Sequence, residues 1–297
     1  MAFGGRVMPM ALLGGLVVFK MSGSGNDFVF VDGRTAPVEL WSVDRIRMVC
    51  ARRTGVGADG LVVLEPGSRP GAVRFHFFNR DGSRGAMCGN AALCATRLAA
   101  WLELAPPTGM VLETDAGEVT SRCLEGEREA AQIDLSEAAV PIVPEIPLES
   151  GERSIHYMKV GVDHLVVVVD DLQRPGLMGR GRVLRSHPAL GAAGANVNFV
   201  ARSSDGWAMR TFERGVEAET LACGTGAVAV TAVLCGAGEA TLPLLILTAS
   251  GSVLEVSGVL RGLSISRPRL AGEGHLVFRA VLGGNPECRA ADLPAQS

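Results

Sequence analysis

Two cysteines, Cys88 and Cys223, stand in matching contexts that could give a thiol chemical work. Cys223 opens the segment CGTGAVAV (223–230), whose glycines free the backbone to bend and whose small apolar residues predict a buried helix. Cys88 opens the similar segment CGNAALCA (88–95). A thiol at a helix start faces unpaired backbone N–H groups and the positive end of the helix dipole. Both favour the thiolate and can hold an anionic ligand.

These two segments occur once in each half of the chain. Such a repetition suggests a duplicated unit, with an active site between the two copies. The alternative is a pair of buried structural cysteines in Gly/Ala-rich helices, because free cysteine is among the most buried residue types. A single cysteine of this kind would fit either interpretation. Two in matching contexts favour the reactive one.

Composition excludes several classes of function. The chain has 297 residues, 47% of them hydrophobic and 20% charged, which is typical of one large or two medium globular domains. A net charge of −3 and a pI near 6.0 give no electrostatic reason to bind nucleic acid or a membrane surface. Tyr157 is the only tyrosine, so an aromatic stacking platform for bases is not expected either.

The seven cysteines are odd in number and form no CxxC pair, and the histidines add no ligand spacing to them. We therefore predict neither a disulfide framework nor a metal site, and a reducing, cytoplasmic location. The apolar run at 7–19 imitates a signal peptide, but no small-residue cleavage site follows it. We expect residues 1–14 to be a dispensable extension and no segment to span a membrane.

The elements that must position the cysteines are many short strands and few helices, which predicts an α+β fold of two domains. The glycines at 55–60 formally match GxGxxG, but a helix precedes them and a strand follows. That order is the reverse of a dinucleotide-binding turn. A new strand series is expected to begin at 132–135. The strands are expected at 16–21, 28–32, 61–64, 73–78, 111–114, 118–123, 155–160, 165–169, 195–200, 244–249, 253–256, 263–266 and 276–281, and the helices at 41–53, 88–101, 180–187 and from 223.

Six motifs together resemble diaminopimelate epimerase, a family of the pyridoxal-independent amino-acid racemase superfamily. The resemblance extends from about residue 19 to residue 282 and is specific only when the motifs are taken jointly. They are GSGNDF (23–28), RRTGVGADG (52–60), FFNRDGS (77–83), MCGN (87–90), NVNFV (196–200) and ERGVEAETLACGTGA (213–227).

The resemblance implies two pseudo-symmetric domains, each a curled, mainly antiparallel sheet around a central helix, with the active site in the cleft between them. The first domain would comprise residues 1–130 and 275–297, completed by the last strand, and the second residues 131–274. It also implies a homodimer, a small amino-acid substrate and no cofactor.

Carried over onto this chain, the resemblance assigns a role to twelve residues. Cys88 and Cys223 resemble the two catalytic bases, with His164 as the partner of Cys88 and Glu213 as that of Cys223. Residues resembling contacts to the far end of the substrate are Asn26, Asn79, Asn196, Glu213 and Arg214. Those resembling donors around the reacting carboxylate are Gly89, Asn90, Gly224 and Thr225. Considered without the family, His164 reads as a structural turn residue.

The chain departs from the family pattern just before His164, where many members have Asn-Pro and this sequence has Val162-Asp163. The missing asparagine removes one expected contact to the distal amino acid group. Asp163 is expected to raise the pKa of His164 or to orient its ring. The catalytic residues are otherwise intact, so the chemistry is better specified by the sequence than the substrate is.

Inversion of an α-carbon without a cofactor needs one base on each face and fixed donors in a dry site to stabilise the carbanion. A thiolate and a thiol that exchange roles meet this requirement. The leading hypothesis is therefore an isomerase that interconverts LL- and meso-diaminopimelate, in the route to lysine and peptidoglycan. The alternatives are a racemase of another amino acid on the same fold, and a non-catalytic binding or thiol redox protein.

Overall fold

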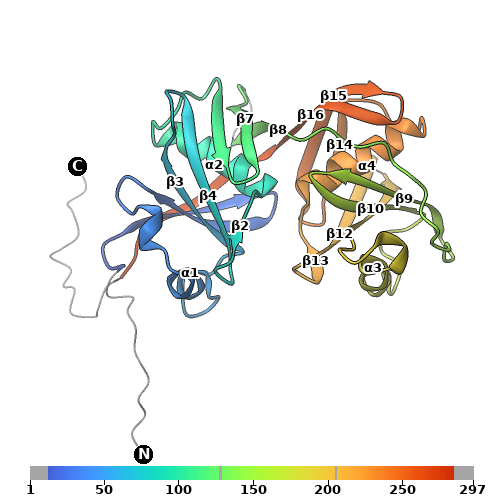
Figure 1. The fold of residues 1–297 in the computed structure, drawn as a ribbon, viewed down its shortest axis with the longest axis horizontal. Helices are drawn as coiled ribbons and strands as arrows, with labels where there is room; N and C mark the ends of the chain where they lie inside the picture. Colours follow the sequence, from blue (N-terminus) through green and yellow to red (C-terminus); the bar gives the residue numbers. More distant parts are fainter. Residues whose placement is uncertain (1–12, 127–128, 205, 284–297) are drawn as a thin grey trace, which may run out of the picture.

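The structure, a computed structural model, describes residues 13–126, 129–204 and 206–283 and contains two series of elements in the same order (Figure 1). The first series comprises β1 (Val17–Gly23), β2 (Asn26–Asp32), α1 (Val43–Cys50), β3 (Gly60–Pro66), β4 (Ala72–Asn79), β5 (Arg84–Gly85), α2 (Gly89–Trp101), β6 (Met110–Thr114), β7 (Gly117–Cys123) and β8 (Ala130–Asp134). The second comprises β9 (Glu152–Val160), β10 (Val162–Val169), α3 (Leu177–Arg185), β11 (Asn196–Ser203), β12 (Gly206–Glu213), β13 (Ala218–Thr220), α4 (Gly224–Gly236), β14 (Leu244–Leu247), β15 (Val253–Arg261) and β16 (Ser264–Glu273). The described part ends with β17 (His275–Val281).

Strand pairing repeats as well. In the first series the ladder runs β1-β2-β3-β4-β6-β7-β8, with parallel pairs only at β2–β3 and β4–β6. In the second it runs β9-β10-β11-β12-β14-β15-β16, with parallel pairs only at β10–β11 and β12–β14. The predicted duplicated, mainly antiparallel α+β fold is therefore confirmed.

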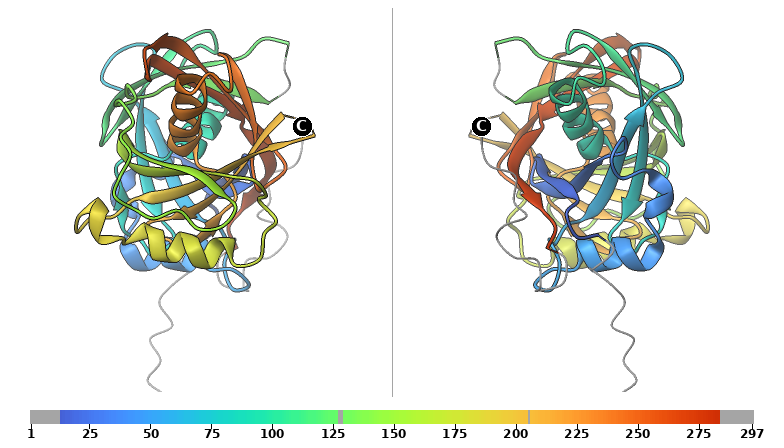
Figure 2. Two further views of the ribbon diagram at one scale, coloured as in Figure 1. Left: turned by 90° about the vertical axis from the view of Figure 1, so that its right-hand side faces the viewer. Right: turned by 90° about the vertical axis from the view of Figure 1, so that its left-hand side faces the viewer.

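Each series curls around one helix, α2 in the first and α4 in the second. Nearly every residue of α4 is buried, so the helix has no polar face. Its glycines, alanines and valines are small enough for strands to approach it from several sides. Viewed along the long axis of the molecule, the two helices lie one behind the other with strands around them (Figure 2).

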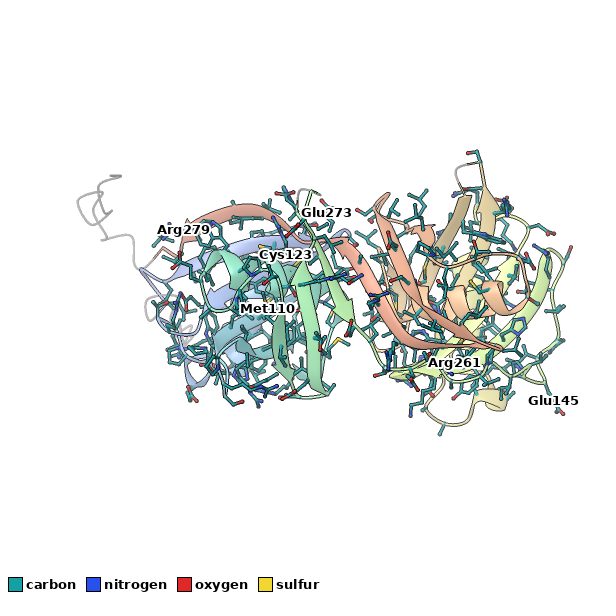
Figure 3. All side chains as sticks on the ribbon, turned by 90° about the horizontal axis from the view of Figure 1, so that it is seen from above. Met110, Cys123, Glu145, Arg261, Glu273 and Arg279 are labelled. Carbon is teal, nitrogen blue, oxygen red and sulfur yellow. The ribbon has the colours of Figure 1, made fainter. Side chains whose placement is uncertain are left out.

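The two series are joined by the last strand of each, because β8 pairs antiparallel with β16. β16 ends at Glu273, and the chain then returns as β17 to the first lobe, the part formed by the first series, where β17 pairs with β1 (Figure 3). The strand expected to open the second series is β8, which pairs with β7 of the first series and with β16 of the second and so belongs to both ladders. The predicted domain boundary at 130/131 falls on this shared strand and stays a prediction.

Two other expectations need revision. β12 was not predicted, although Trp207, Met209 and Thr211 are buried at every second position, the period of a strand with one buried face. The expected extension at 1–14 lies mostly outside the described residues, but Leu13 is fully buried in a core cluster with Val18. Leu13 is therefore part of the fold. Within the described ranges, no helix is long and apolar enough to cross a membrane.

Candidate active site

The starts of the two central helices meet. Cys88 and Cys223 are the N-cap residues of α2 and α4, with nearly the same backbone angles: φ −137° and ψ 122° for Cys88, φ −136° and ψ 107° for Cys223. A Cβ added to Gly89 would lie 3.9 Å from the Cα of Gly224. Two helix N-termini and two thiols are thus brought to one place, where both helix dipoles favour negative charge.

Burial shifts the pKa values of the two thiols more strongly than the helix starts do. Burial raises the pKa of Cys88 to about 12, and the backbone N–H groups of Asn90 and Ala91 offset this only in part. Burial also raises the pKa of Cys223 to about 12, with Glu213 adding to the shift and the Gly226 N–H and Thr225 hydroxyl opposing it. The expectation of lowered thiol pKa values is therefore wrong for this structure, because desolvation disfavours the charged form.

Glu213 ends β12 and acts on both cysteines. Burial raises its own pKa, and the Thr220 hydroxyl opposes that shift only in part. The charge of Glu213 raises the pKa of Cys88 and of Cys223, so its carboxyl group is within electrostatic reach of both thiols. A carboxyl with a raised pKa beside two thiols is suited to exchange a proton with one of them.

His164, in β10, is fully buried and lies beside Asn198 of the neighbouring strand. The Asn198 amide donates to its Nδ1 over 3.1 Å, while its Nε2 has no hydrogen-bond partner among the described residues. Burial lowers the pKa of His164 to about 3. The charge of Asp163 raises the pKa of His164, as expected, but burial outweighs it and the net shift is downward.

Asp163 instead joins a polar group with Tyr157 and Arg214. The Tyr157 hydroxyl donates to its Oδ1 over 2.8 Å, and Arg214 Nη1 lies 3.3 Å from its Oδ2. Arg214 also donates to the carbonyl oxygen of Gly194, and its backbone N–H donates to Asn196 Oδ1 over 2.9 Å. The substitution of Asn-Pro by Val162-Asp163 therefore places a carboxylate next to the arginine.

Asn90 connects the two lobes and also holds Asn26. Asn90 Nδ2 donates to Asn26 Oδ1 over 3.0 Å and to the carbonyl oxygen of Ala222 over 3.1 Å, next to Cys223. Asn90 Oδ1 is buried and has no hydrogen-bond partner in the described parts of the chain. Asn79, another predicted contact, uses its amide within its own turn, where it donates to the Ser83 hydroxyl.

Sequence reasoning missed two polar residues of this region, Asp59 and Asn198. Asp59 accepts hydrogen bonds from Asn26 and Arg52, and its charge acts on Cys88 and on Glu213. It lies in the motif RRTGVGADG, whose glycines alone were used to interpret the segment. Asn198 lies in NVNFV two residues after Asn196. On a strand, side chains two positions apart point to the same face of the sheet, which was the available signal.

One group of potential metal ligands lies at the crossing between the lobes. Glu129, Glu273 and His275 offer ligand atoms within 4.8 Å of one another. His275 Nδ1 is already hydrogen-bonded to the Glu129 carboxylate, and all three side chains are partly exposed. These residues were not predicted as ligands.

Solved structures define the class of fold. A phenazine biosynthesis protein of the PhzF family from Bacillus anthracis superposes with a TM-score of 0.69 at 15% identity, covering 89% of this chain and 98% of that one. A predicted epimerase from Pseudomonas aeruginosa superposes with a TM-score of 0.68 at 21% identity, covering 90% and 98%. The protein thus has the two-lobed fold shared by these proteins.

Sequence comparison identifies the family within this fold. The family model for diaminopimelate epimerase matches residues 18–140 and 156–258. The diaminopimelate epimerase of Gemmatimonas aurantiaca is 43% identical over 274 residues, covering 89% of this chain and 98% of that protein. The Aquifex aeolicus enzyme of the same name is 38% identical over 253 residues, covering 80% and 88%. The chain belongs to the diaminopimelate epimerase family.

The buried His164 predicts a pH dependence of stability. With a folded pKa of about 3 against an ordinary 6.5, the ring is neutral in the folded state and protonated in the unfolded chain between these values. His164 therefore lowers the unfolding free energy as pH falls from 6.5 to 3, by roughly 1.4 kcal/mol per pH unit. Chemical denaturation across this range should show a steeper loss for the wild type than for His164→Gln. Equal slopes of unfolding free energy against pH in the two proteins would contradict a His164 ring that stays neutral in the folded state.

Proposed function

We propose that the protein interconverts LL- and meso-diaminopimelate without a cofactor, using Cys88 and Cys223 as acid and base on opposite faces of one α-carbon. One observation carries the proposal, namely that the helices bearing the two cysteines meet at their N-termini, at Gly89 and Gly224. Membership of the diaminopimelate epimerase family supports the choice of substrate.

In this mechanism one cysteine is a thiolate and removes the α-proton, while the opposite thiol delivers a proton to the other face. The roles reverse in the reverse reaction. Because both thiols have raised pKa values, the proton that leaves the first thiol needs an acceptor, and Glu213 is the nearby carboxyl with a raised pKa. Before the reaction, the first thiol gives its proton to the Glu213 carboxylate. The resulting thiolate then takes the α-proton while the opposite thiol gives a proton to the carbon, so no net proton is gained or lost.

The carbanion needs stabilisation at the adjoining carboxylate. The first turns of α2 and α4 offer the backbone N–H groups of Gly89, Asn90, Gly224 and Thr225, whose intrahelical partners are missing at a helix start. Donors from two helices that converge on one carboxylate favour the doubly negative form that develops as the proton leaves. We assign these four residues to the reacting end of the substrate.

The far end of diaminopimelate carries a second ammonium and a second carboxylate. Arg214 is suited to the carboxylate, and Asp163 beside it supplies a negative charge for the ammonium where many relatives have a neutral residue. Asn26, Asn79 and Asn196 complete the proposed contacts to this end. A racemase of another amino acid remains the second candidate, favoured by Val162, which replaces the expected asparagine.

We further propose a homodimer located in the cytoplasm. The β17 strand pairs with β1 in the described structure. Its residues Val277, Phe278 and Val281 have exposed fractions of 49%, 42% and 48%. An apolar strand at a sheet edge suits a second copy of the chain. The six described cysteines are free, as expected in a reducing compartment. Sedimentation equilibrium distinguishes one copy from two.

The activity is tested by incubating the purified protein with LL-diaminopimelate in deuterated water without added cofactor. We expect deuterium at one α-carbon of the product together with formation of the meso isomer, because the returned proton comes from a thiol that has exchanged with solvent. Exchange with another amino acid but not with diaminopimelate would preserve the mechanism and change the substrate. No exchange with any amino acid would overturn the proposal.

The role of Asp163 is tested with Asp163→Asn, which keeps the shape and removes the charge. We expect KM for diaminopimelate to rise roughly ten- to a hundredfold, because hydrogen bonds to charged groups contribute about 1.5–3 kcal/mol. Asp170→Asn, an exposed change just beyond the other end of β10, serves as the matched control and should leave KM unchanged. An unchanged KM in Asp163→Asn would remove this residue from the far-end contacts.

A further inference from the structure

Asn198 is a buried polar residue that the mechanism above does not use. Its side chain is fully buried and makes three hydrogen bonds. Its Nδ2 lies 3.1 Å from His164 Nδ1 and 3.2 Å from the Leu165 carbonyl oxygen, and its Oδ1 lies 3.0 Å from the Thr211 hydroxyl. Asn198 thus connects β10, β11 and β12 on the face that packs against α4.

These contacts determine which way the Asn198 amide points. The Leu165 carbonyl oxygen can only accept a hydrogen bond, so the amide atom that faces it must be the NH₂ group. The same NH₂ group faces His164 Nδ1, and the amide oxygen faces the Thr211 hydroxyl, which can donate to it. The reversed amide would place two oxygens 3.2 Å apart with no proton between them.

The amide orientation in turn fixes the protonation of the ring. Because Asn198 donates to His164 Nδ1, that nitrogen must offer its lone pair. A neutral imidazole carries one proton, which is then on Nε2. Burial disfavours the doubly protonated ring. His164 Nε2 is buried and has no hydrogen-bond partner among the described residues, so its N–H is left without an acceptor there.

Asn198 is held in place by the start of α4 as well. A Cβ added to Gly226 would lie 2.2 Å from Asn198 Oδ1 and 3.1 Å from Cys223 Sγ. Only a glycine at 226 therefore leaves room for the asparagine, and the amide sits beside the thiol of the second half. The position of the His164 ring is thereby tied to the same helix start that positions Cys223.

We propose that Asn198 is a positioning residue that holds His164 as a neutral imidazole with its proton on Nε2, so that His164 donates a hydrogen bond to an anion in the site and does not accept a proton from a thiol. This role rests on the proposed epimerase function. It revises the part expected of His164 as a base beside Cys88. It also leaves Glu213 as the group that accepts the thiol proton.

The tautomer can be observed without any assay of activity. Protein labelled with ¹⁵N-histidine gives separate nitrogen resonances for protonated and unprotonated ring nitrogens, and His164→Gln assigns the signals of this ring. At neutral pH we expect His164 Nδ1 unprotonated and Nε2 protonated. A protonated Nδ1 in the wild type would overturn the proposal, whether or not the protein is an epimerase.

The Asn198→Asp variant tests the positioning role. Once the introduced carboxyl is ionised, which its burial shifts to higher pH, it can only accept, so His164 must place a proton on Nδ1 to meet it. Above that pH the Nδ1 resonance should move to the protonated position. We expect kcat to fall by at least about tenfold, the effect typical of losing a partner that orients a histidine ring. KM should change less, and the pH profile of kcat should shift. An Nδ1 resonance that stays unmoved when the introduced carboxyl is ionised would contradict the proposal.

Two isosteric variants provide a milder test and its control. Thr211→Val removes the hydroxyl that holds Asn198 Oδ1, so the His164 nitrogen signals should show loss of the single tautomer. Thr231→Val removes an equally buried hydroxyl that bonds to Ala227 within α4, and it should leave these signals unchanged. Equal spectra for the two variants would show that the network does not fix the ring, even if Asn198→Asp fails to fold.

Discussion

The close approach of two helix N-termini determines where the polar and titratable groups of this protein gather. The two helices begin at Gly89 and Gly224, and a Cβ added to either glycine would lie 3.9 or 4.0 Å from the Cα of the other. The duplicated fold supplies the geometry, with one central helix in each lobe and the shared β8–β16 pair holding the lobes together. The cysteines at the two N-cap positions are close enough for the charge of Cys88 to raise the pKa of Cys223, and the proposed proton transfer on both faces of one carbon requires this proximity.

Gathering these groups in a dry site has an electrostatic cost that the structure distributes over several residues. Burial raises the pKa of both thiols and of Glu213, and it lowers the pKa of His164, so every group is pushed towards its neutral form. The backbone N–H groups at the helix starts oppose this for the thiols. The proposed catalysis by one thiolate therefore depends on groups that favour its charge when substrate is present, and the proposal assigns this part to the Nε2–H of His164.

Local patterns in the sequence were sufficient to predict the repeated cysteine helices, because glycine and small apolar residues act within a few positions. Most strands were also predictable from their apolar alternation. What the sequence could not provide depends on register and burial. Asn198 reaches His164 only because β10 and β11 pair in parallel with Asn196 opposite His164, and the direction of the thiol pKa shifts follows from tertiary burial. The role of β8 likewise depends on its pairing with β16.

Deuterium exchange by variants that each lack one of the two cysteines shows whether one thiol acts on each face of the reacting carbon. Cys88→Ala and Cys223→Ala should both fail to epimerise, yet each should exchange the α-proton of one stereoisomer with retention. The isomer should be opposite in the two variants. Cys94→Ala, which removes another buried thiol from the interior of α2, should still epimerise. Epimerisation by either active-site variant, or exchange of the same isomer by both, would contradict the account.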